Sequence, residues 1–475
     1  MYFMELLLNH STYMKVFMER ESLGSRLGFL LLAAGCAIGL GNVWRFPFIT
    51  GENGGGAFVL LYLIFLAILG VPVLVMELSL GRASRRNYVG AFTDLANSKP
   101  KVWRSFATVF YSGTLLLMMF YTTVSGWLIY YTSSYVTGSI SACKSSEQIG
   151  TFFTDLLQNP GMMSICMLAG VVASGIICSI GLQKGVERIV KWMMGLLFIL
   201  LIVLCVRGLM LPGAGEGMKF YLLPDFSKFS GDNIGKVIYA ALGQAFFTLS
   251  IGIGSMEIFG SYIDKKHTLL KEAFLIVVLD TLIALFAGVL IFSVCFSYKV
   301  DVSGGPGLIF VSLPNIFKDM AGGRIWGAIF FFFLTLAAMT TLIAVFEAMI
   351  AYLMDEFKFK RFTASLAVTL AVGILSLPCV FGFNFWSGFQ PFGKGSTVLD
   401  LEDFIVSMNL LPLGSLMIVV FCTWKFGWGW KNAVEEINQG AGVKFPCKSY
   451  FYMKYILPLI IGIVFVMGYI SMFFK

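Results

Sequence analysis

The stretch AGCAIGLGNVWRFP, residues 34–47, interrupts the first long apolar segment of the chain. The whole segment, from Gly28 to Thr50, is long enough to cross a bilayer. Its second half nevertheless holds glycines, an asparagine, an arginine and a proline. Lipid cannot satisfy free backbone polar groups, so an unwound stretch at membrane depth must line protein or a water-filled cavity. The sequence therefore predicts a place where something polar is bound or conducted.

The composition is typical of an integral membrane protein. Hydrophobic residues make up 58% of the 475 residues and charged residues only 13%, whereas a soluble domain carries roughly 25% charged residues. The chain is predicted to be all-α, with eleven transmembrane helices at residues 27–50, 57–81, 105–134, 161–181, 188–210, 236–262, 271–297, 324–353, 362–382, 399–424 and 449–473. These spans use nearly all of the sequence, so we expect no separate soluble domain.

Basic residues predict the orientation. They concentrate between the second and third spans and in every alternate loop after that. The positive-inside rule then places the N-terminus in the cytoplasm, and an odd number of spans places the C-terminus outside. The net charge of +8 is therefore a topology signal and indicates no nucleic-acid partner. We expect a multi-pass protein of the cell (plasma or inner) membrane, in contact with the lipid bilayer.

Three regions follow from this topology. Residues 1–26 are expected to form a cytoplasmic N-terminal segment, residues 27–424 a ten-helix core, and residues 425–475 a cytoplasmic loop with the eleventh helix. Residues 1–17 lack the pattern of a cleavable signal peptide, and Met18 is an alternative start.

A second break lies in the sixth span, in the stretch GQAFFTLSIGIGS at residues 243–255. Interrupted helices at matching positions of two halves point to a transporter binding site. Spans one and six are five apart, which predicts two inverted five-helix repeats. Each glycine alone is equally explained by close helix packing.

Three motifs resemble the neurotransmitter:sodium symporter family: GLGNVWRFP at residues 39–47, ENGGGAF at 52–58 and QAFFTLS at 244–250. The resemblance runs from about Arg20 to the end of the chain, and the eleven spans are similar to the prokaryotic amino-acid branch. It implies a leucine-transporter-type 5+5 inverted repeat with helices 1 and 6 unwound. It also implies sodium-coupled secondary active uptake of an amino acid by alternating access, and no enzymatic activity.

The resemblance implies two sodium sites made of oxygen ligands. The first comprises Ala37, Asn42, Thr248 and Asp280, completed by the substrate carboxylate. The second comprises Gly35, Ile38, Ala337, Thr340 and Thr341. Without the resemblance, the two neighbouring threonines are better explained by hydrogen bonds to carbonyls of their own helix.

Asp280 also decides whether chloride is expected to be needed. A carboxylate inside a membrane helix marks an ion path by default, although structural pairing with a neighbouring helix is the alternative. The family places an asparagine at this position, and chloride-dependent members carry a serine one turn later, where this chain has Ala284. The resemblance therefore implies that Asp280 supplies the fixed negative charge beside sodium, and that no chloride is needed.

The implied substrate site lies at the same breaks. The amino-acid carboxylate is expected to meet backbone N–H groups around Gly39 and Gly41, at the positive end of a half-helix, and the hydroxyl of Tyr121. Monoamine-carrying relatives place an aspartate where this chain has Gly39. The implied substrate-binding residues are Ala37, Gly39, Gly41, Leu117, Tyr121, Phe247, Thr248, Ser250, Ile253, Thr341 and Val345. The side-chain subpocket is apolar, so a hydrophobic amino acid is expected, although any one of these apolar residues is equally typical of plain packing.

Two gates are implied on either side of this site. Arg45 and Asp403 resemble the extracellular ion pair, with Tyr121 and Phe247 as an aromatic lid below it. Arg20 and Asp355 resemble the cytoplasmic pair, with Tyr262 nearby. Two departures concern the cytoplasmic end: Leu23 stands where the family has a tryptophan, and Gly195 stands where some bacterial members have a helix-kinking proline.

Other classes of function fit less well. A channel is expected to carry continuous polar pore residues, whereas polarity here gathers in one midplane zone. A non-transporting amino-acid sensor of the same fold is the remaining alternative. The nine cysteines and two histidines show no zinc-ligand spacing. The sequence also shows no intramembrane Ser/His, Cys/His or metal cluster of the kind that would indicate an enzyme.

Overall fold

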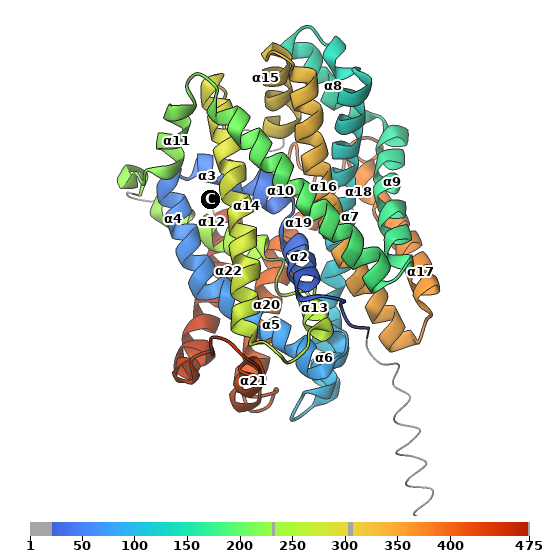
Figure 1. Ribbon diagram of the computed structural model, residues 1–475, viewed down its shortest axis with the longest axis vertical. Coiled ribbons are helices and arrows are strands. Elements are labelled where there is room, and N and C mark those ends of the chain that lie inside the picture. The colour runs from blue at the N-terminus through green and yellow to red at the C-terminus, as the bar shows by residue number, and fades with distance from the viewer. Residues whose placement is uncertain (1–20, 230–232, 303–306, 474–475) are drawn as a thin grey trace, which may run out of the picture.

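The computed structural model describes residues 21–229, 233–302 and 307–473, and the regular structure of these residues is helical (Figure 1). Arg20 and Met18 lie outside the described residues. In the described part of the chain, nine helices are long and apolar enough to cross a membrane: Gly56–Ser84, Pro100–Thr137, Pro160–Ser179, Leu182–Leu209, Leu269–Ser297, Gly323–Phe357, Arg361–Phe381, Val398–Thr423 and Cys447–Ile470. A tenth is counted if Arg26–Ala37 and Gly41–Glu52, which meet at 55°, are one span. The protein is therefore a multi-pass membrane protein.

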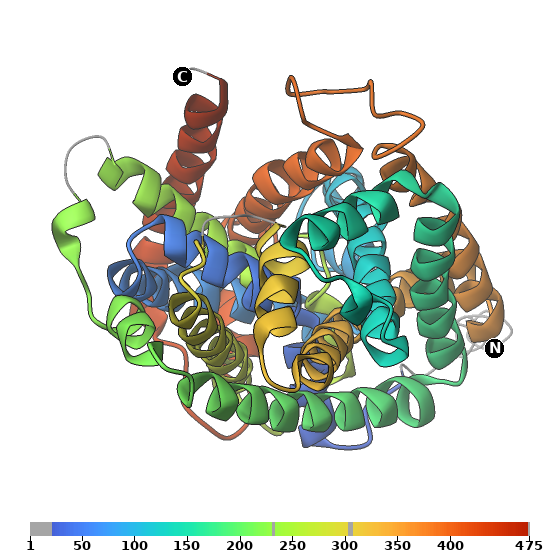
Figure 2. The same ribbon diagram turned by 90° about the horizontal axis from the view of Figure 1, so that it is seen from above.

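The helices surround a buried centre rather than forming one layer, as the view along the bundle shows (Figure 2). Two long helices form much of this centre, α7 (Pro100–Thr137) and α16 (Gly323–Phe357). Helix α16 packs along α7 and against α2 (Arg26–Ala37). It is the most enclosed of the nine long helices, which is consistent with its apolar residues facing other helices on nearly every side.

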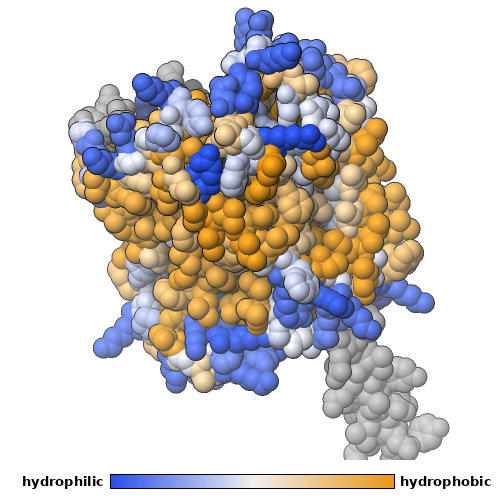
Figure 3. Space-filling view, turned by 45° about the horizontal axis from the view of Figure 1, so that its top comes forward, coloured by the Kyte–Doolittle hydropathy of each residue, from blue (hydrophilic) through white to orange (hydrophobic). Residues whose placement is uncertain are grey.

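The outer surface carries an apolar belt between two polar ends (Figure 3). Isoleucine, leucine and valine side chains of α10 (Arg188–Leu209) and α22 (Leu457–Phe473) contribute to it. These helices belong to the two least enclosed of the nine spans. Apolar side chains are stable on this surface because the surrounding medium is hydrocarbon.

The basic loops predicted to be cytoplasmic lie at one end of the bundle. They include α6 (Tyr88–Asp94) and α21 (Trp430–Ile437). The alternate loops carry α8 (Ser146–Gln158) and α15 (Leu313–Asp319), and Figure 1 shows these at the opposite end. The charge pattern of the sequence thus matches the arrangement of the loops.

Candidate functional site

The regular α-helix stops within the first predicted break. Helix α2 ends at Ala37, Ile38 adopts an extended conformation, and η1 (Gly41–Arg45) and α3 (Phe46–Glu52) follow. The last carbonyls of a helix have no partner within it. In the last turn of α2, the Ala34 carbonyl accepts from the N–H of the cap residue Ile38 at 2.7 Å. The carbonyl groups of Gly35 and Cys36 are therefore available to groups outside the helix.

The second predicted break separates α12 (Asn233–Thr248) from α13 (Glu257–Tyr262). The backbone between them takes left-handed conformations, with φ of 51° at Ser250, 103° at Gly252 and 86° at Gly254. Glycine tolerates such angles at no steric cost, whereas serine does so less readily. The path of the chain therefore favours glycine at residues 252 and 254, whereas Ser250 adopts a left-handed angle that is uncommon for serine.

A buried carboxylate supports this second break. Glu77, on α5 (Val71–Ser84), accepts hydrogen bonds from the backbone N–H of Gly252 at 2.8 Å and of Met256 at 3.3 Å. It replaces acceptors that the interrupted helix no longer supplies. Sequence analysis missed Glu77, although a lone glutamate in the apolar run 57–81 was a visible signal.

Three residues of the first implied sodium site form one buried cluster. The Asn42 amide Nδ2 lies 2.8 Å from Asp280 Oδ1 and 3.1 Å from Thr248 Oγ1. The Thr248 hydroxyl donates to Asp280 Oδ2 at 2.9 Å. Helix α14 (Leu269–Ser297) carries Asp280, and no basic side chain in the described part of the chain is ion-paired with it. A buried carboxylate with only neutral donors is electrostatically suited to a cation.

The second implied sodium site gathers more oxygen atoms. The Thr341 hydroxyl lies 3.2 Å from the Gly35 carbonyl oxygen, 3.4 Å from those of Cys36 and Ile38, and 3.5 Å from that of Ala337. The neighbouring Thr340 hydroxyl donates to the Ala337 carbonyl at 2.8 Å.

One hydroxyl hydrogen can satisfy only one of these four carbonyls well. The set is therefore rich in unused acceptor oxygens, the donor chemistry that hard cations prefer. Gly35, Ile38, Ala337, Thr340 and Thr341 fit a sodium ion, with Cys36 as an additional carbonyl that the sequence did not suggest.

A small cavity of about 20 Å³ lies between the two breaks. Its lining includes eight of the eleven implied substrate residues: Ala37, Gly39, Gly41, Leu117, Tyr121, Phe247, Ser250 and Thr341. Cys36, Leu40 and Leu411 also line it and were missed. Thr248, Ile253 and Val345 are buried but do not line it. The Tyr121 hydroxyl accepts from the Leu40 N–H at 3.4 Å, so it already faces the backbone groups expected to bind a carboxylate.

Two glycines of the first break are in close contact with other side chains. A Cβ on Gly39 would lie 2.6 Å from the Tyr121 hydroxyl oxygen and 2.8 Å from that of Thr341. A Cβ on Gly41 would lie 2.8 Å from the ring of Phe247. Contacts this short do not occur without movement of the neighbours, so the cavity as it stands requires glycine at both positions.

A larger cavity of about 510 Å³ lies toward the non-basic end of the bundle. Arg45, Asp403, Tyr121 and Phe247 all contribute to its lining. The Arg45 guanidinium lies 4.1 Å from the centre of the Phe247 ring, a cation–π contact. Asp403 accepts from the Ser407 hydroxyl at 2.5 Å. The implied gate residues therefore share one cavity, but within the described residues Arg45 contacts the aromatic lid rather than pairing with Asp403.

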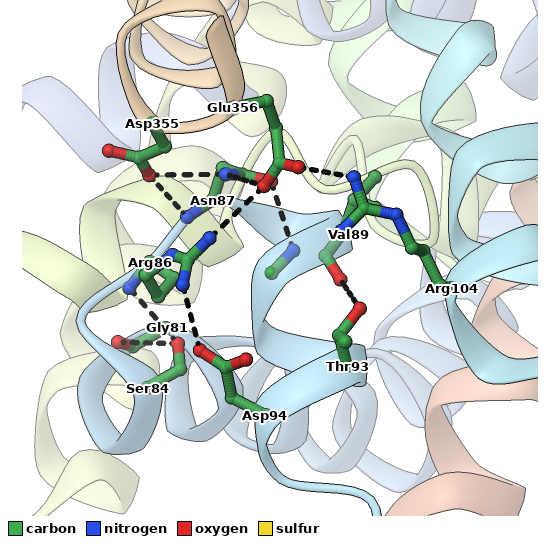
Figure 4. Close-up of polar contacts among 11 residues, drawn as sticks. Gly81, Ser84, Arg86, Asn87, Val89, Thr93, Asp94, Arg104, Asp355 and Glu356 are labelled. Carbon is green, nitrogen blue, oxygen red and sulfur yellow. Dashed lines mark hydrogen bonds and ion pairs between the residues drawn. The ribbon is translucent and has the colours of Figure 1, made fainter. Parts of the chain in front are cut away.

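At the basic end, Asp355 and its neighbour Glu356 belong to a polar cluster at the end of α16 (Figure 4). Asp355 Oδ2 accepts from the backbone N–H of Asn87 at 2.7 Å. Glu356 accepts from Arg86 at 3.2 Å and pairs with Arg104. The cluster fastens α6 and α7 to the end of α16.

Tyr262 contacts a second buried ion pair. Its hydroxyl donates to Glu347 Oε1 at 2.8 Å. Glu347 is fully buried and ion-paired with Arg361 at 2.8 Å. The sequence analysis gave no site role to Glu347 or Arg361. They lie on either side of a helix-to-helix turn, and the pairing depends on how those helices pack.

Comparisons with known proteins show which family the chain belongs to. The family model described as the sodium:neurotransmitter symporter family matches residues 20–151 and 144–474. The uncharacterized sodium-dependent transporter YhdH of Bacillus subtilis (strain 168) is 34% identical, over 93% of this chain and 96% of its own length. A sodium-dependent transporter of Haemophilus influenzae is 33% identical, over 94% and 98%.

Among solved structures, that of MhsT in complex with L-phenylalanine aligns with a TM-score of 0.84 and 37% identity. The alignment covers 94% of this chain and all of MhsT. The chain therefore belongs to the sodium:neurotransmitter symporter family and is a sodium-dependent membrane transporter, not an enzyme.

Proposed function

We propose that this protein couples the inward movement of sodium to the uptake of a hydrophobic amino acid by alternating access. The observation that carries the proposal is the oxygen set around Thr341. Part of it comes from the broken end of α2 and part from α16. A cation held there links two helices, so its binding and release change their relative stability.

The proposed architecture has eleven spans. Helices α12 and α13 together form the sixth, broken at residues 249–256. Spans one to five and six to ten form inverted repeats over residues 27–424, and residues 425–475 add a loop and the eleventh span. The basic loops are cytoplasmic, so the N-terminus lies inside and the C-terminus outside. The cavity of about 510 Å³ then faces outward.

The proposed cargo follows from the small cavity. Backbone N–H groups and the Tyr121 hydroxyl suit a carboxylate, and among the described residues no acidic side chain lines the cavity to pair a lone amine. Leu117, Phe247 and Leu411 suit an apolar side chain. The similarity to MhsT, which was solved with L-phenylalanine, supports a hydrophobic amino acid. The sodium of the Asn42–Asp280 cluster then lies beside the substrate carboxylate.

We also propose that transport does not require chloride. The Asp280 carboxylate already places a negative charge at the first sodium site. Ala284, one turn later on α14, is buried and has no hydroxyl to hold an anion.

The test is uptake into proteoliposomes with an inward sodium gradient, using radiolabelled phenylalanine and competition by the twenty amino acids. We expect accumulation that stops when choline replaces sodium, and competition by hydrophobic amino acids. Protein-free liposomes are the control. Equal uptake in choline would contradict sodium coupling. Sodium-dependent binding without accumulation would favour the sensor alternative.

A further inference from the structure

The buried carboxylate of Glu187 fastens the cytoplasmic start of α2 to the segment that leads into α10. Glu187 ends η4 (Leu182–Glu187), which leads into α10. Its Oε2 accepts from the Gly24 N–H at 2.7 Å, and its Oε1 accepts from the Ser25 hydroxyl at 3.0 Å and from Lys191 Nζ at 2.5 Å. Only 4% of the Glu187 side chain is exposed. Hydrogen bonds to a charged group in such a position are among the stronger ones in proteins.

Ser25 completes this contact. It is the N-cap of α2, and its hydroxyl accepts from the Gly28 N–H at 3.0 Å. The same oxygen also accepts from Lys191 Nζ at 2.7 Å while its hydrogen goes to Glu187. A serine hydroxyl offers one donor and two acceptor positions. All three are used, so the cap that starts α2 is also the point where α2 meets α10.

Gly28 shows how closely the two parts fit. A Cβ at this position would lie 2.0 Å from Glu187 Oε1 and 2.4 Å from its Cδ. Nearby, Gln183 Nε2 donates to the Ser22 carbonyl at 2.7 Å. The carboxylate thus occupies the space that any side chain at residue 28 would need.

The same face of α10 reaches the second sodium set. Residues 187, 190, 191 and 194 follow the spacing of one helix face. A Cβ on Gly35 would lie 3.3 Å from Val190 Cγ1 and 3.4 Å from Met194 Sδ. The Gly35 carbonyl is the one nearest the Thr341 hydroxyl. One helix face therefore contacts α2 at its cytoplasmic start and again beside the sodium ligands.

We propose that Glu187 is the positioning residue that holds the cytoplasmic half of helix 1 closed, and that opening this contact frees the sodium and substrate sites toward the cytoplasm. The inference rests on the proposed function for its meaning in transport. Its structural content, that α2 stays closed through Glu187 and Lys191, is independent of the cargo.

A second contact at the start of α2 is an ion pair with a different helix. Arg26 pairs with Glu272 of α14 at 2.9 Å, and the arginine side chain is 39% exposed. The Glu272 side chain is fully buried, so both pairs join a buried carboxylate to a partly exposed base. The Glu187 contact differs because its carboxylate also accepts from the backbone of Gly24 and from the Ser25 hydroxyl that caps α2.

The test uses Cys36, a native thiol on α2 that is fully buried and lines the small cavity. Cys143 and Cys447, the two cysteines that are not buried, are replaced by serine. A membrane-impermeant maleimide is added to vesicles with the basic-loop end outward, and labelling of the Cys36 peptide is measured by mass spectrometry. A parallel preparation that keeps Cys447 reports the orientation of the vesicles.

In the absence of sodium, Glu187→Ala should label about tenfold faster than the parent, the change that loss of one hydrogen bond to a charged group corresponds to. Lys191→Ala should also label faster than the parent. The labelling rate of Glu187→Gln should lie between those of Glu187→Ala and the parent. Lys184→Ala, at an exposed lysine of the same η4 segment, is the matched control and should label like the parent.

Parent-like labelling of both Glu187→Ala and Lys191→Ala would overturn the proposal. If Glu187→Ala elutes as an aggregate, Lys191→Ala and Ser25→Ala decide the question, since they remove the partners and leave the carboxylate. If Glu187→Ala labels faster but the parent shows no sodium-dependent uptake, the role of Glu187 in closure is retained and the proposed function is rejected. If the parent shows sodium-dependent uptake but Glu187→Ala and Lys191→Ala label like the parent, the proposed function is retained and the role of Glu187 is rejected.

Discussion

The hydroxyl of Thr341 lies 3.2 Å from the carbonyl oxygen of Gly35, and this contact joins the middle of α16 to the broken end of α2. The two residues are 306 positions apart in the chain. Their proximity brings together carbonyl groups that the end of α2 leaves without helical partners. The following predictions concern this contact and the groups around it.

Thr341→Val should lower the apparent sodium affinity about tenfold, since one oxygen ligand is lost and a bond to a charged group is worth roughly 1.5–3 kcal/mol. The measurement is the sodium dependence of uptake or of substrate binding. Thr335→Val is the matched control. Thr335 lies on α16, like Thr341, but its hydroxyl bonds Thr132 of α7 at 2.9 Å, away from the site. An equal sodium dependence in both variants would place the cation elsewhere.

Gly39→Asp should abolish binding of zwitterionic amino acids. The new side chain would enter the space of the Tyr121 and Thr341 hydroxyls and add a negative charge where the substrate carboxylate is expected. Gly195→Ala is the control, since a Cβ there meets nothing within 4 Å. It should bind substrate normally and can gain up to about 1 kcal/mol of helix stability. Normal substrate affinity in Gly39→Asp would mean that the site lies elsewhere.

Uptake by the wild-type protein should be the same in sodium gluconate and in sodium chloride. Asp280→Asn together with Ala284→Ser should create a chloride requirement, because the fixed charge is removed and a hydroxyl is added one turn away. Ala284→Ser alone should remain independent of chloride. A strong chloride requirement in the wild type would show that Asp280 does not supply the counter-charge.

Glu77→Ala should destabilise the fold by about 2–6 kcal/mol, because the N–H groups of Gly252 and Met256 would lose buried acceptors and each loss costs about 1–3 kcal/mol. Thermal unfolding in detergent measures the change. Glu77→Gln keeps an acceptor oxygen and should lose less. The exposed Glu435→Ala is a surface control that should unfold like the wild type, and a parent-like melting temperature for Glu77→Ala would refute the role assigned to Glu77.

The breaks were predictable because local chemistry determines them. Glycine and serine density marked both interruptions, and the structure has α2 ending at Ala37 and α12 ending at Thr248. Most of the cavity lining followed from family motifs near these breaks. The omissions have a common cause: Leu411 and Glu187 acquire their surroundings only through packing between distant helices. No local pattern records that a particular leucine faces a cavity or that a glutamate caps another helix.

Arg45 is a residue whose position the sequence predicted but whose contact it did not. Its position beside the break was evident from the sequence, but its contact with the Phe247 ring depends on the rotamers of both side chains. A motif can place a residue at the mouth of a cavity without deciding which of two neighbours it touches.

The small cavity has room for about one water molecule, far less than an aromatic side chain occupies. If the proposed cargo binds in this cavity, it must displace Phe247, Leu117 or Leu411 as it enters. Under that proposal, selection among amino acids depends on how readily the cavity wall deforms. The buried Ile253 and Val345 do not line the cavity, but they lie three and four positions after Ser250 and Thr341, which do. Changes in cargo preference can therefore arise by substitution behind the lining, with every contact residue unchanged.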